Sequence, residues 1–192
     1  MIKKHWKAFR VSSAACLLGM VCILCALSFQ GCGPEDPHPV NEEEVITTVE
    51  VSLAPEGGGT PVTLRFYDQD GENGSIEPVQ TISGSLATAT VYSAQIALLN
   101  ETITPALNIS DEVEEEGNDH LFCFSVSGDL SIEYDDEDSQ GMPLGLSTRW
   151  LTGGEGQVQL TIILRHQAGT KTGDCPGLGE TDLEVSFGLI VQ

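Results

Sequence analysis

Two turns of the chain carry carboxylates at alternating positions, a pattern that suits a divalent cation. Asp68 and Asp70 form one pair and Asp136 and Asp138 the other, and each pair lies before a glycine. This resembles the first half of a calcium loop, where alternate oxygen ligands precede a glycine turn. Neither turn has the distal glutamate of an EF-hand, and Asp and Gly are also ordinary hairpin residues. The turns are therefore candidates for calcium or another divalent cation, with plain turns as the alternative.

Two histidines offer a different kind of metal site. His120 and His166 each lie at the end of a predicted strand. Together with the carboxylate of Glu116 or Asp119, they can supply two nitrogens and an oxygen to zinc or copper. The alternative is a pair of surface or hydrogen-bonded histidines, because separate strands need not bring them together.

Motifs of catalysis do not occur in the chain. There is no Gly-x-Ser-x-Gly elbow, no His-Glu-x-x-His helix and no phosphate-binding loop. Each of these motifs places a nucleophile, a metal or a phosphate by a fixed spacing. The sequence therefore predicts a protein that is not an enzyme.

The first 31 residues have the features of a targeting signal. Four basic residues and no acid occur in positions 1–10, an apolar run fills positions 11–29, and Gly31 precedes Cys32. This layout is typical of a secretory signal, and its end resembles the lipobox of bacterial lipoproteins. We therefore expect cleavage after residue 31 and lipidation of Cys32, which would hold the protein on a membrane. A retained transmembrane anchor is the alternative, because the apolar run is just long enough to span a bilayer.

Residues 32–44 are rich in proline and acids, which predicts an extended tether. Glu35 and Asp36 follow the cysteine as in the surface-export signal of Bacteroidota lipoproteins, so the expected location is the outer membrane, facing the periplasm or the surface. Cleavage leaves four basic residues against all 29 acids, a formal net charge of −25 (4 − 29). Repulsion then excludes nucleic acid as a partner.

Two cysteines, Cys123 and Cys175, remain after cleavage and lipidation. In an oxidising envelope they are natural disulfide partners. The alternative is two unpaired thiols, because the sequence does not show whether their Cα atoms come close enough for a bridge.

Residues 45–192 are predicted to form one all-β domain. Apolar residues alternate with polar ones in eight segments, which is typical of half-buried strands, and a ninth strand is doubtful at 79–82. Short strands between Gly, Pro and Asp turns favour an antiparallel, immunoglobulin-like β-sandwich. Tyr92 follows a stretch that resembles the approach to a tyrosine corner. One short helix is expected at Ser110–Gly117, with Ser110 as its cap and Gly117 as its end. The eight confident segments cover residues 45–53, 62–66, 92–98, 122–126, 130–134, 144–150, 158–164 and 183–191.

Several stretches of the predicted domain resemble a family of small lipoproteins from flavobacteria and related Bacteroidota. Members of that family are often labelled with a type 1 periplasmic-binding fold, but the absence of alternating helices here argues against that architecture. The resemblance implies a companion of a TonB-dependent outer-membrane receptor. We expect a lipid-anchored, non-catalytic binding module, with a structural or adhesive lipoprotein as the alternative. The matching stretches are Asn41–Val49, Glu56–Thr63, Asp119–His120, Leu164–Gln167 and Gly179–Phe187.

Overall fold

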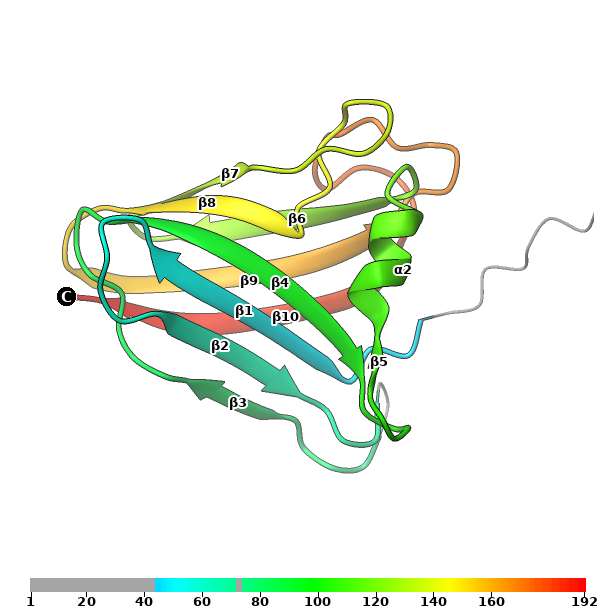
Figure 1. The fold of residues 1–192 in the computed structure, drawn as a ribbon, viewed down its shortest axis with the longest axis horizontal. Coiled ribbons are helices and arrows are strands. Elements are labelled where there is room, and N and C mark those ends of the chain that lie inside the picture. Colours follow the sequence, from blue (N-terminus) through cyan, green and yellow to red (C-terminus); the bar gives the residue numbers. More distant parts are fainter. Residues whose placement is uncertain (1–43, 72–73) are drawn as a thin grey trace, which may run out of the picture. The chain divides into compact units, whose positions relative to one another are not determined.

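Two antiparallel sheets and one short helix make up the computed structural model, which describes residues 44–71 and 74–192 (Figure 1). The larger sheet has the strand order β3-β2-β1-β4-β8-β7, with β5 paired to β4 beside this path, and the smaller sheet has the order β10-β9-β6. The all-β sandwich that the sequence predicts is confirmed, and residues 79–82 do form a strand. The strands are β1 (Thr48–Pro55), β2 (Val62–Tyr67), β3 (Val79–Ile82), β4 (Val91–Asn100), β5 (Leu107–Asn108), β6 (His120–Ser127), β7 (Leu130–Tyr134), β8 (Ser147–Thr152), β9 (Gly156–His166) and β10 (Glu180–Val191).

The core lies between the facing surfaces of the two sheets. Val49, Val51 and Leu53 alternate along β1 and are fully buried, while Val185 and Phe187 do the same along β10. Period-two burial of this kind places one face of each strand in the core and the other in solvent. The two inner faces are what hold the domain together, at roughly 25 cal/mol for each Å² of apolar surface removed from water.

The predicted tyrosine corner is present at the start of β4. The hydroxyl of Tyr92 accepts a hydrogen bond of 2.8 Å from the backbone N–H of Ala87, five residues upstream. Tyr92 is 2% exposed, so its ring packs in the core while its oxygen satisfies a backbone donor. This arrangement is a mark of immunoglobulin-like sandwiches.

The short helix α2 (Ile109–Glu115) is where the sequence places it, but its ends differ from the prediction. The N-cap is Asn108, whose side-chain oxygen accepts from the backbone N–H of Ser110. The Ser110 hydroxyl is not the cap because it accepts instead from the N–H of Leu98 in β4, at 2.7 Å. The C-cap is Glu116, one residue before the predicted Gly117.

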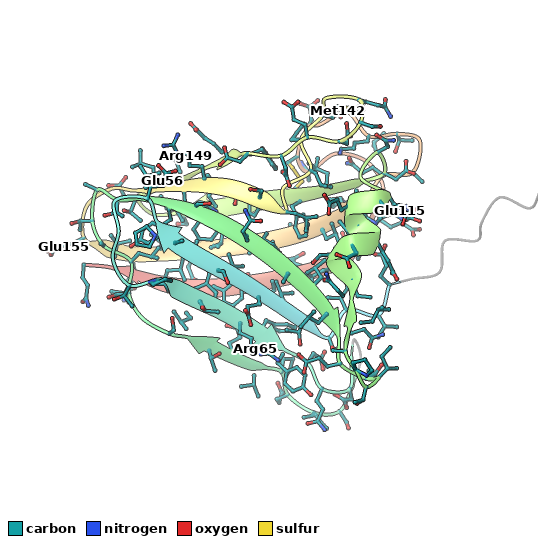
Figure 2. The ribbon with its side chains drawn as sticks, in the orientation of Figure 1. Glu56, Arg65, Glu115, Met142, Arg149 and Glu155 are labelled. Carbon is teal, nitrogen blue, oxygen red and sulfur yellow. A yellow bond between two sulfur atoms is a disulfide. The ribbon has the colours of Figure 1, made fainter. Side chains whose placement is uncertain are left out.

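Basic residues on the outer surface are paired with acids. Arg65 lies 2.6 Å from Glu101 and 3.4 Å from Glu50, and Arg149 lies 2.8 Å from Glu56. Figure 2 shows the labelled Glu56 and Arg149 close together on the outside of the domain. Pairs this exposed stabilise a fold by only about 0–1 kcal/mol.

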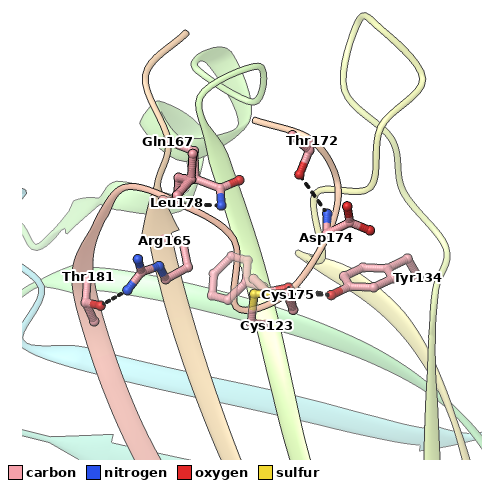
Figure 3. Close-up of a disulfide and its surroundings, with 10 residues drawn as sticks. Cys123, Tyr134, Arg165, Gln167, Thr172, Asp174, Cys175, Leu178 and Thr181 are labelled. Carbon is pink, nitrogen blue, oxygen red and sulfur yellow. Dashed lines mark hydrogen bonds between the residues drawn. A yellow bond between two sulfur atoms is a disulfide. The ribbon is translucent and has the colours of Figure 1, made fainter. Parts of the chain in front are cut away.

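The loop between β9 and β10 is fastened to the strands beside it. Cys175 in this loop forms a disulfide with Cys123 of β6, which closes a separation of 52 residues (Figure 3). Next to the bridge, the Tyr134 hydroxyl donates to the carbonyl of Phe122 at 2.6 Å. A link over this span stabilises by about 4 kcal/mol on the chain-entropy model. The loop is therefore held against the end of the smaller sheet.

Candidate metal centre

The first acidic turn uses its carboxylates on its own backbone. Asp70 accepts hydrogen bonds from the backbone N–H groups of Ser75 and Ile76, at 2.7 and 3.1 Å, and Asp68 accepts from that of Gly71 at 3.1 Å. The hydrogen bond from Ser75 is the main cause that holds the pKa of Asp70 below its ordinary value. These contacts are typical of a side chain that shapes a turn.

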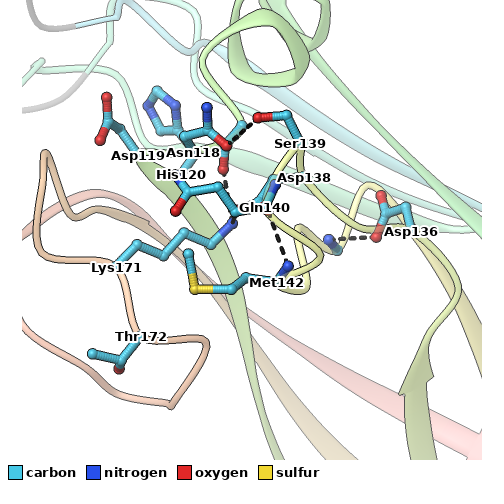
Figure 4. A network of polar contacts seen from close by, with 12 residues as sticks. Asn118, Asp119, His120, Asp136, Asp138, Ser139, Gln140, Met142, Lys171 and Thr172 are labelled. Atoms are coloured by element: carbon cyan, nitrogen blue, oxygen red, sulfur yellow. Dashed lines mark hydrogen bonds and ion pairs between the residues drawn. The ribbon is translucent and has the colours of Figure 1, made fainter.

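The second acidic turn is also occupied, by backbone donors and by a lysine. Asp136 accepts from the N–H groups of Gly145 and Ser147, at 2.6 and 2.7 Å. Asp138 accepts from the N–H groups of Gln140 and Met142, and the ammonium of Lys171 donates to it at 2.7 Å (Figure 4). The side chains of Lys171 and Asp138 are 1% and 0% exposed. Burial opposes ionisation of Asp138, but Lys171 and the backbone donors outweigh it and lower the pKa.

The two histidines come together, as a metal site would require. His120 begins β6, His166 ends β9, and the antiparallel register places them directly opposite each other. Their rings stack with centroids 4.8 Å apart and planes 14° from parallel. Cross-strand neighbours on one face of a sheet lie within this range. In Figure 1 this is the end of the sheets beside α2.

His120 is the fully buried member of the pair, and its surroundings fix where its protons lie. Its Nδ1 is 3.2 Å from the backbone carbonyl of Glu116, an oxygen that can only accept, so Nδ1 carries a hydrogen. Its Nε2 faces two carboxylates, with Glu44 Oε1 at 3.1 Å and Asp182 Oδ2 at 3.9 Å. Glu44 is close enough to form an ion pair with a protonated His120, but by strict geometry both Nε2 and Asp182 Oδ2 are buried without a hydrogen-bond partner.

Asp182 reaches His120 because β10 contains a β-bulge. The register of β10 against β9 shifts between Thr181 and Leu183, so Asp182 has no partner in the ladder. Further along the strand Glu184 points to solvent and Val185 to the core. Strict alternation would turn Asp182 outward with Glu184, but the extra residue of a bulge re-aims side chains. Asp182 is left with a side chain only 11% exposed.

The electrostatics of the cluster favour protons or a cation. Burial raises the pKa of Asp182 to about 6, and the nearby Glu44 carboxylate adds to this effect. Burial would lower the pKa of His120, but Glu44, the Glu116 carbonyl and Asp182 together outweigh it and raise the pKa. The carboxylates of Glu44 and Asp182 repel each other unless positive charge lies near them, either as a proton on His120 or as a bound cation.

Glu44, His120 and Asp182 together have the composition of a three-ligand metal site. Their donor atoms, one nitrogen and two carboxylate oxygens, all lie within 4.8 Å of one another. The contact from Nδ1 to the Glu116 carbonyl is the kind of bond that orients most metal-binding histidines. Among residues 44–71 and 74–192, this is the group of His, Cys, Asp and Glu side chains that meets the geometric requirement for holding an ion.

The structure brings His120 together with Glu44 and Asp182 and not with the predicted carboxylates of Glu116 and Asp119. The predicted second ligand, His166, stacks on His120 but is not part of the triad. Glu116 contacts His120 through a backbone carbonyl, and the Asp119 carboxylate accepts from the N–H of Gly169 instead. Glu44 and Asp182 were missed because one lies in the predicted tether and the other depends on a bulge.

Comparison with known proteins finds no match: no family model fits the chain, and no curated protein or solved structure resembles it closely enough to be significant. Across the described part of the chain, no helix is both long and apolar enough to cross a bilayer. Cys32, with the expected signal peptide and most of the expected tether, lies outside the described residues, so lipidation stays a prediction.

Proposed function

We propose that this protein is a lipid-anchored, non-catalytic lipoprotein of the cell envelope whose β-sandwich binds a divalent transition-metal ion at Glu44, His120 and Asp182. One observation carries the proposal: His120 Nε2 and Asp182 Oδ2 are buried at the same place and have no hydrogen-bond partner. Leaving a buried polar atom unsatisfied costs about 1–3 kcal/mol. An ion between them would remove that cost for both atoms.

The donor set restricts which ion fits. One imidazole and two carboxylates suit zinc and its first-row neighbours, whereas calcium prefers six or more oxygens. Copper(I) prefers thiolate and thioether ligands, and the triad has neither. Cys123 and Cys175 are joined in a disulfide and so supply no thiolate. Zinc is therefore the ion we expect, with cobalt(II) as its spectroscopic substitute.

The test is a cobalt(II) and zinc titration of the full-length chain, purified with detergent present. Asp182→Asn keeps the shape of the side chain but removes its charge, and it should weaken metal binding about tenfold or more. Glu184→Gln is the matched control, because Glu184 is an exposed acid two residues away on the same strand. Equal affinity in both variants would show that the metal binds elsewhere.

Anchoring needs an independent experiment, because the lipoprotein assignment depends on residues before the domain. Metabolic labelling with a fatty-acid analogue should mark the wild type and not Cys32→Ala. Proteolysis of intact cells then distinguishes a surface domain from a periplasmic one. On the resemblance to the small Bacteroidota lipoproteins, we propose a TonB-dependent receptor as the partner. The protein would supply metal to that receptor. A chain that is lipidated but binds no metal would favour the structural or adhesive alternative.

A further inference from the structure

One end of the larger sheet carries most of the exposed large apolar side chains of the domain. The strand register defines this end, because Thr48 at the start of β1 pairs with both Tyr67 of β2 and Leu99 of β4. Val79 of β3 and Asn108 of β5 continue the same row on either side. Residues 44–71 and 74–192 include nine exposed large apolar side chains, and five of them lie at or just beyond this row and form an apolar rim: Val45, Ile76, Val79, Ile103 and Leu107.

The loop between β4 and β5 is the part of the rim without charge. Residues 102–107 are all exposed, and none of them is acidic or basic. The base of the loop is held in place by Thr47, whose hydroxyl accepts from the backbone N–H of Glu101 at 2.8 Å. Exposed apolar residues that gather in one place mark a surface that binds protein or lipid. The rim is therefore a candidate docking surface.

The chain enters the domain at this same end, where residues 44–47 lead into β1 (Figure 1). The expected lipid on Cys32 lies twelve residues before Glu44. A segment of this length spans no more than about 43 Å when fully extended. A short link of this kind gives the lipid surface a high effective concentration around the rim. Even a weak contact between the rim and a bilayer would then be occupied, which selects lipid as the occupant.

Charge decides which lipid surface fits. Asp68, Asp70 and Glu77 lie in the loop between β2 and β3, at the same end as the rim. Carboxylates are repelled by an anionic lipid surface but not by one without net charge. Isoleucine and leucine side chains bind at the boundary between headgroups and acyl chains in proportion to the apolar area that they bury. A zwitterionic bilayer therefore suits this end of the domain.

We propose that the apolar rim docks the anchored domain on a zwitterionic lipid bilayer, with the loop between β4 and β5 in the headgroup region. This inference rests on the proposed lipid anchor and is independent of the metal site. It gives the anchored domain a fixed orientation in place of free rotation on its tether. Glu44 precedes Val45 of the rim, so the triad would lie close to the membrane plane.

The test uses the full-length lipidated chain, reconstituted from detergent into phosphatidylcholine vesicles with brominated acyl chains. Ile103→Trp places a fluorophore in the rim. Ile190→Trp is the matched control at the opposite end of the domain, because Ile103 and Ile190 are 50% and 46% exposed. Bromine quenches tryptophan only at short range, so Ile103→Trp should be quenched and Ile190→Trp should not. Trp150 is fully buried and adds the same background to both.

A second substitution tests whether the rim itself makes the contact. Leu107→Ser, added to Ile103→Trp, removes a neighbouring apolar group and should lower the quenching about twofold, because less apolar area enters the bilayer. Leu151→Ser in the same background is the control and should leave the quenching unchanged. Leu151 is also exposed, but it pairs with Val91 at the start of β4, away from the rim.

The outcomes separate the rim from the anchor. Flotation on a density gradient shows first whether the chain stays with the vesicles. A wild type that does not float overturns both the lipid anchor and the docking that rests on it. A chain that floats but shows no quenching of Ile103→Trp, or equal quenching of Ile103→Trp and Ile190→Trp, overturns only the docking, and a protein surface would then be the occupant to seek. Equal quenching after Leu107→Ser and Leu151→Ser overturns the docking as well.

Discussion

Two buried polar clusters lie among the loops and strand ends of this protein, and they differ in how their atoms are satisfied. In the first, Asp138 receives two backbone N–H groups and the ammonium of Lys171, which also donates to the carbonyl of Gly117. In the second, His120 Nε2 and Asp182 Oδ2 face each other, and neither atom has a hydrogen-bond partner. Both clusters are acidic and buried, but only the first is complete.

This contrast shows that acidity is a poor guide to a metal site in so acidic a chain. The carboxylates of Asp136 and Asp138, which resemble a calcium loop in the sequence, accept hydrogen bonds from backbone N–H groups and from Lys171. Buried polar groups in native proteins are nearly always paired, so the ones that are not need a reason. In the described part of the chain four buried side-chain atoms lack a hydrogen-bond partner, and two of them, His120 Nε2 and Asp182 Oδ2, face each other, while the others belong to Arg165 and Gln167. Two unsatisfied atoms that face each other therefore mark the candidate site better than charge does.

The largest effect should come from breaking the complete cluster. Lys171→Ala leaves the buried Asp138 carboxylate without its cation, and it should lower the free energy of unfolding by about 3–5 kcal/mol. Arg149→Ala removes the exposed pair with Glu56 and should cost less than about 1 kcal/mol. Urea unfolding of both variants checks the difference. Equal losses would mean that the buried pair is no more important than a surface one.

The next effect concerns the charge of Asp182 in metal-free protein. Its pKa is raised from 3.8 to about 6, so between these values the folded state binds more protons than the unfolded state. Its contribution to stability is therefore present at low pH and is lost as pH rises to about 6. An asparagine side chain cannot titrate, so the stability of Asp182→Asn relative to wild type should rise by about 2 kcal/mol between pH 4 and pH 6.5.

Unfolding at a series of pH values with chelator present measures this difference, and Glu184→Gln again provides the exposed control. The series ends at pH 6.5 because Glu44, the Glu116 carbonyl and Asp182 raise the pKa of His120 against the effect of burial, which moves its titration in the folded state toward higher pH. If the stability difference between Asp182→Asn and wild type did not change with pH, the surroundings of Asp182 would not raise its pKa.

A gain of comparable size should follow from filling the incomplete cluster. Zinc at a hundred times its dissociation constant should stabilise the wild type by about 2.7 kcal/mol. Asp182→Asn should lose most of this gain, while Lys171→Ala should keep it, because Lys171 belongs to the other cluster. Thermal melts with and without zinc test the expectation. If zinc still stabilised Asp182→Asn but no longer stabilised Lys171→Ala, zinc would bind at the cluster of Asp138 and Lys171 and not at the triad.

The smallest effect is expected for calcium. The carboxylates of both acidic turns already accept hydrogen bonds, so calcium should raise the melting temperature no more than sodium at matched ionic strength. Asp68→Asn with Asp70→Asn, and Asp136→Asn with Asp138→Asn, serve as the two site variants. A calcium shift that vanishes in one of these double variants would restore that turn as a calcium site.

Much of the fold could be predicted because the core is built from strict alternation. The alternation of apolar and polar residues is enough to predict the strand that contains Val49, Val51 and Leu53. The tyrosine corner at Tyr92 is predicted by the local sequence before it. The helix ends were harder, because Ser110 prefers a tertiary contact with β4 to its own cap.

The candidate site could be predicted only in part, because it depends on long-range register. His120 and His166 lie 46 positions apart and meet only because β6 and β9 pair in one register. Asp182 reaches the site only because of a β-bulge, and no residue type in the sequence predicts that bulge. Glu44 lies before the first strand, where no strand was predicted to position it. The carboxylates that lie beside His120 in the structure therefore differ from those that lie near it in the sequence.

Glu44 has a mechanical consequence. It stands four residues before β1, which lies inside the larger sheet, while His120 and Asp182 belong to the smaller sheet. An ion bound to all three would cross-link the two sheets at the point where the chain enters the domain. Tension applied through the N-terminus would then reach a coordinate bond before it could peel β1 from its neighbours, so occupancy by metal would set how much force the domain withstands.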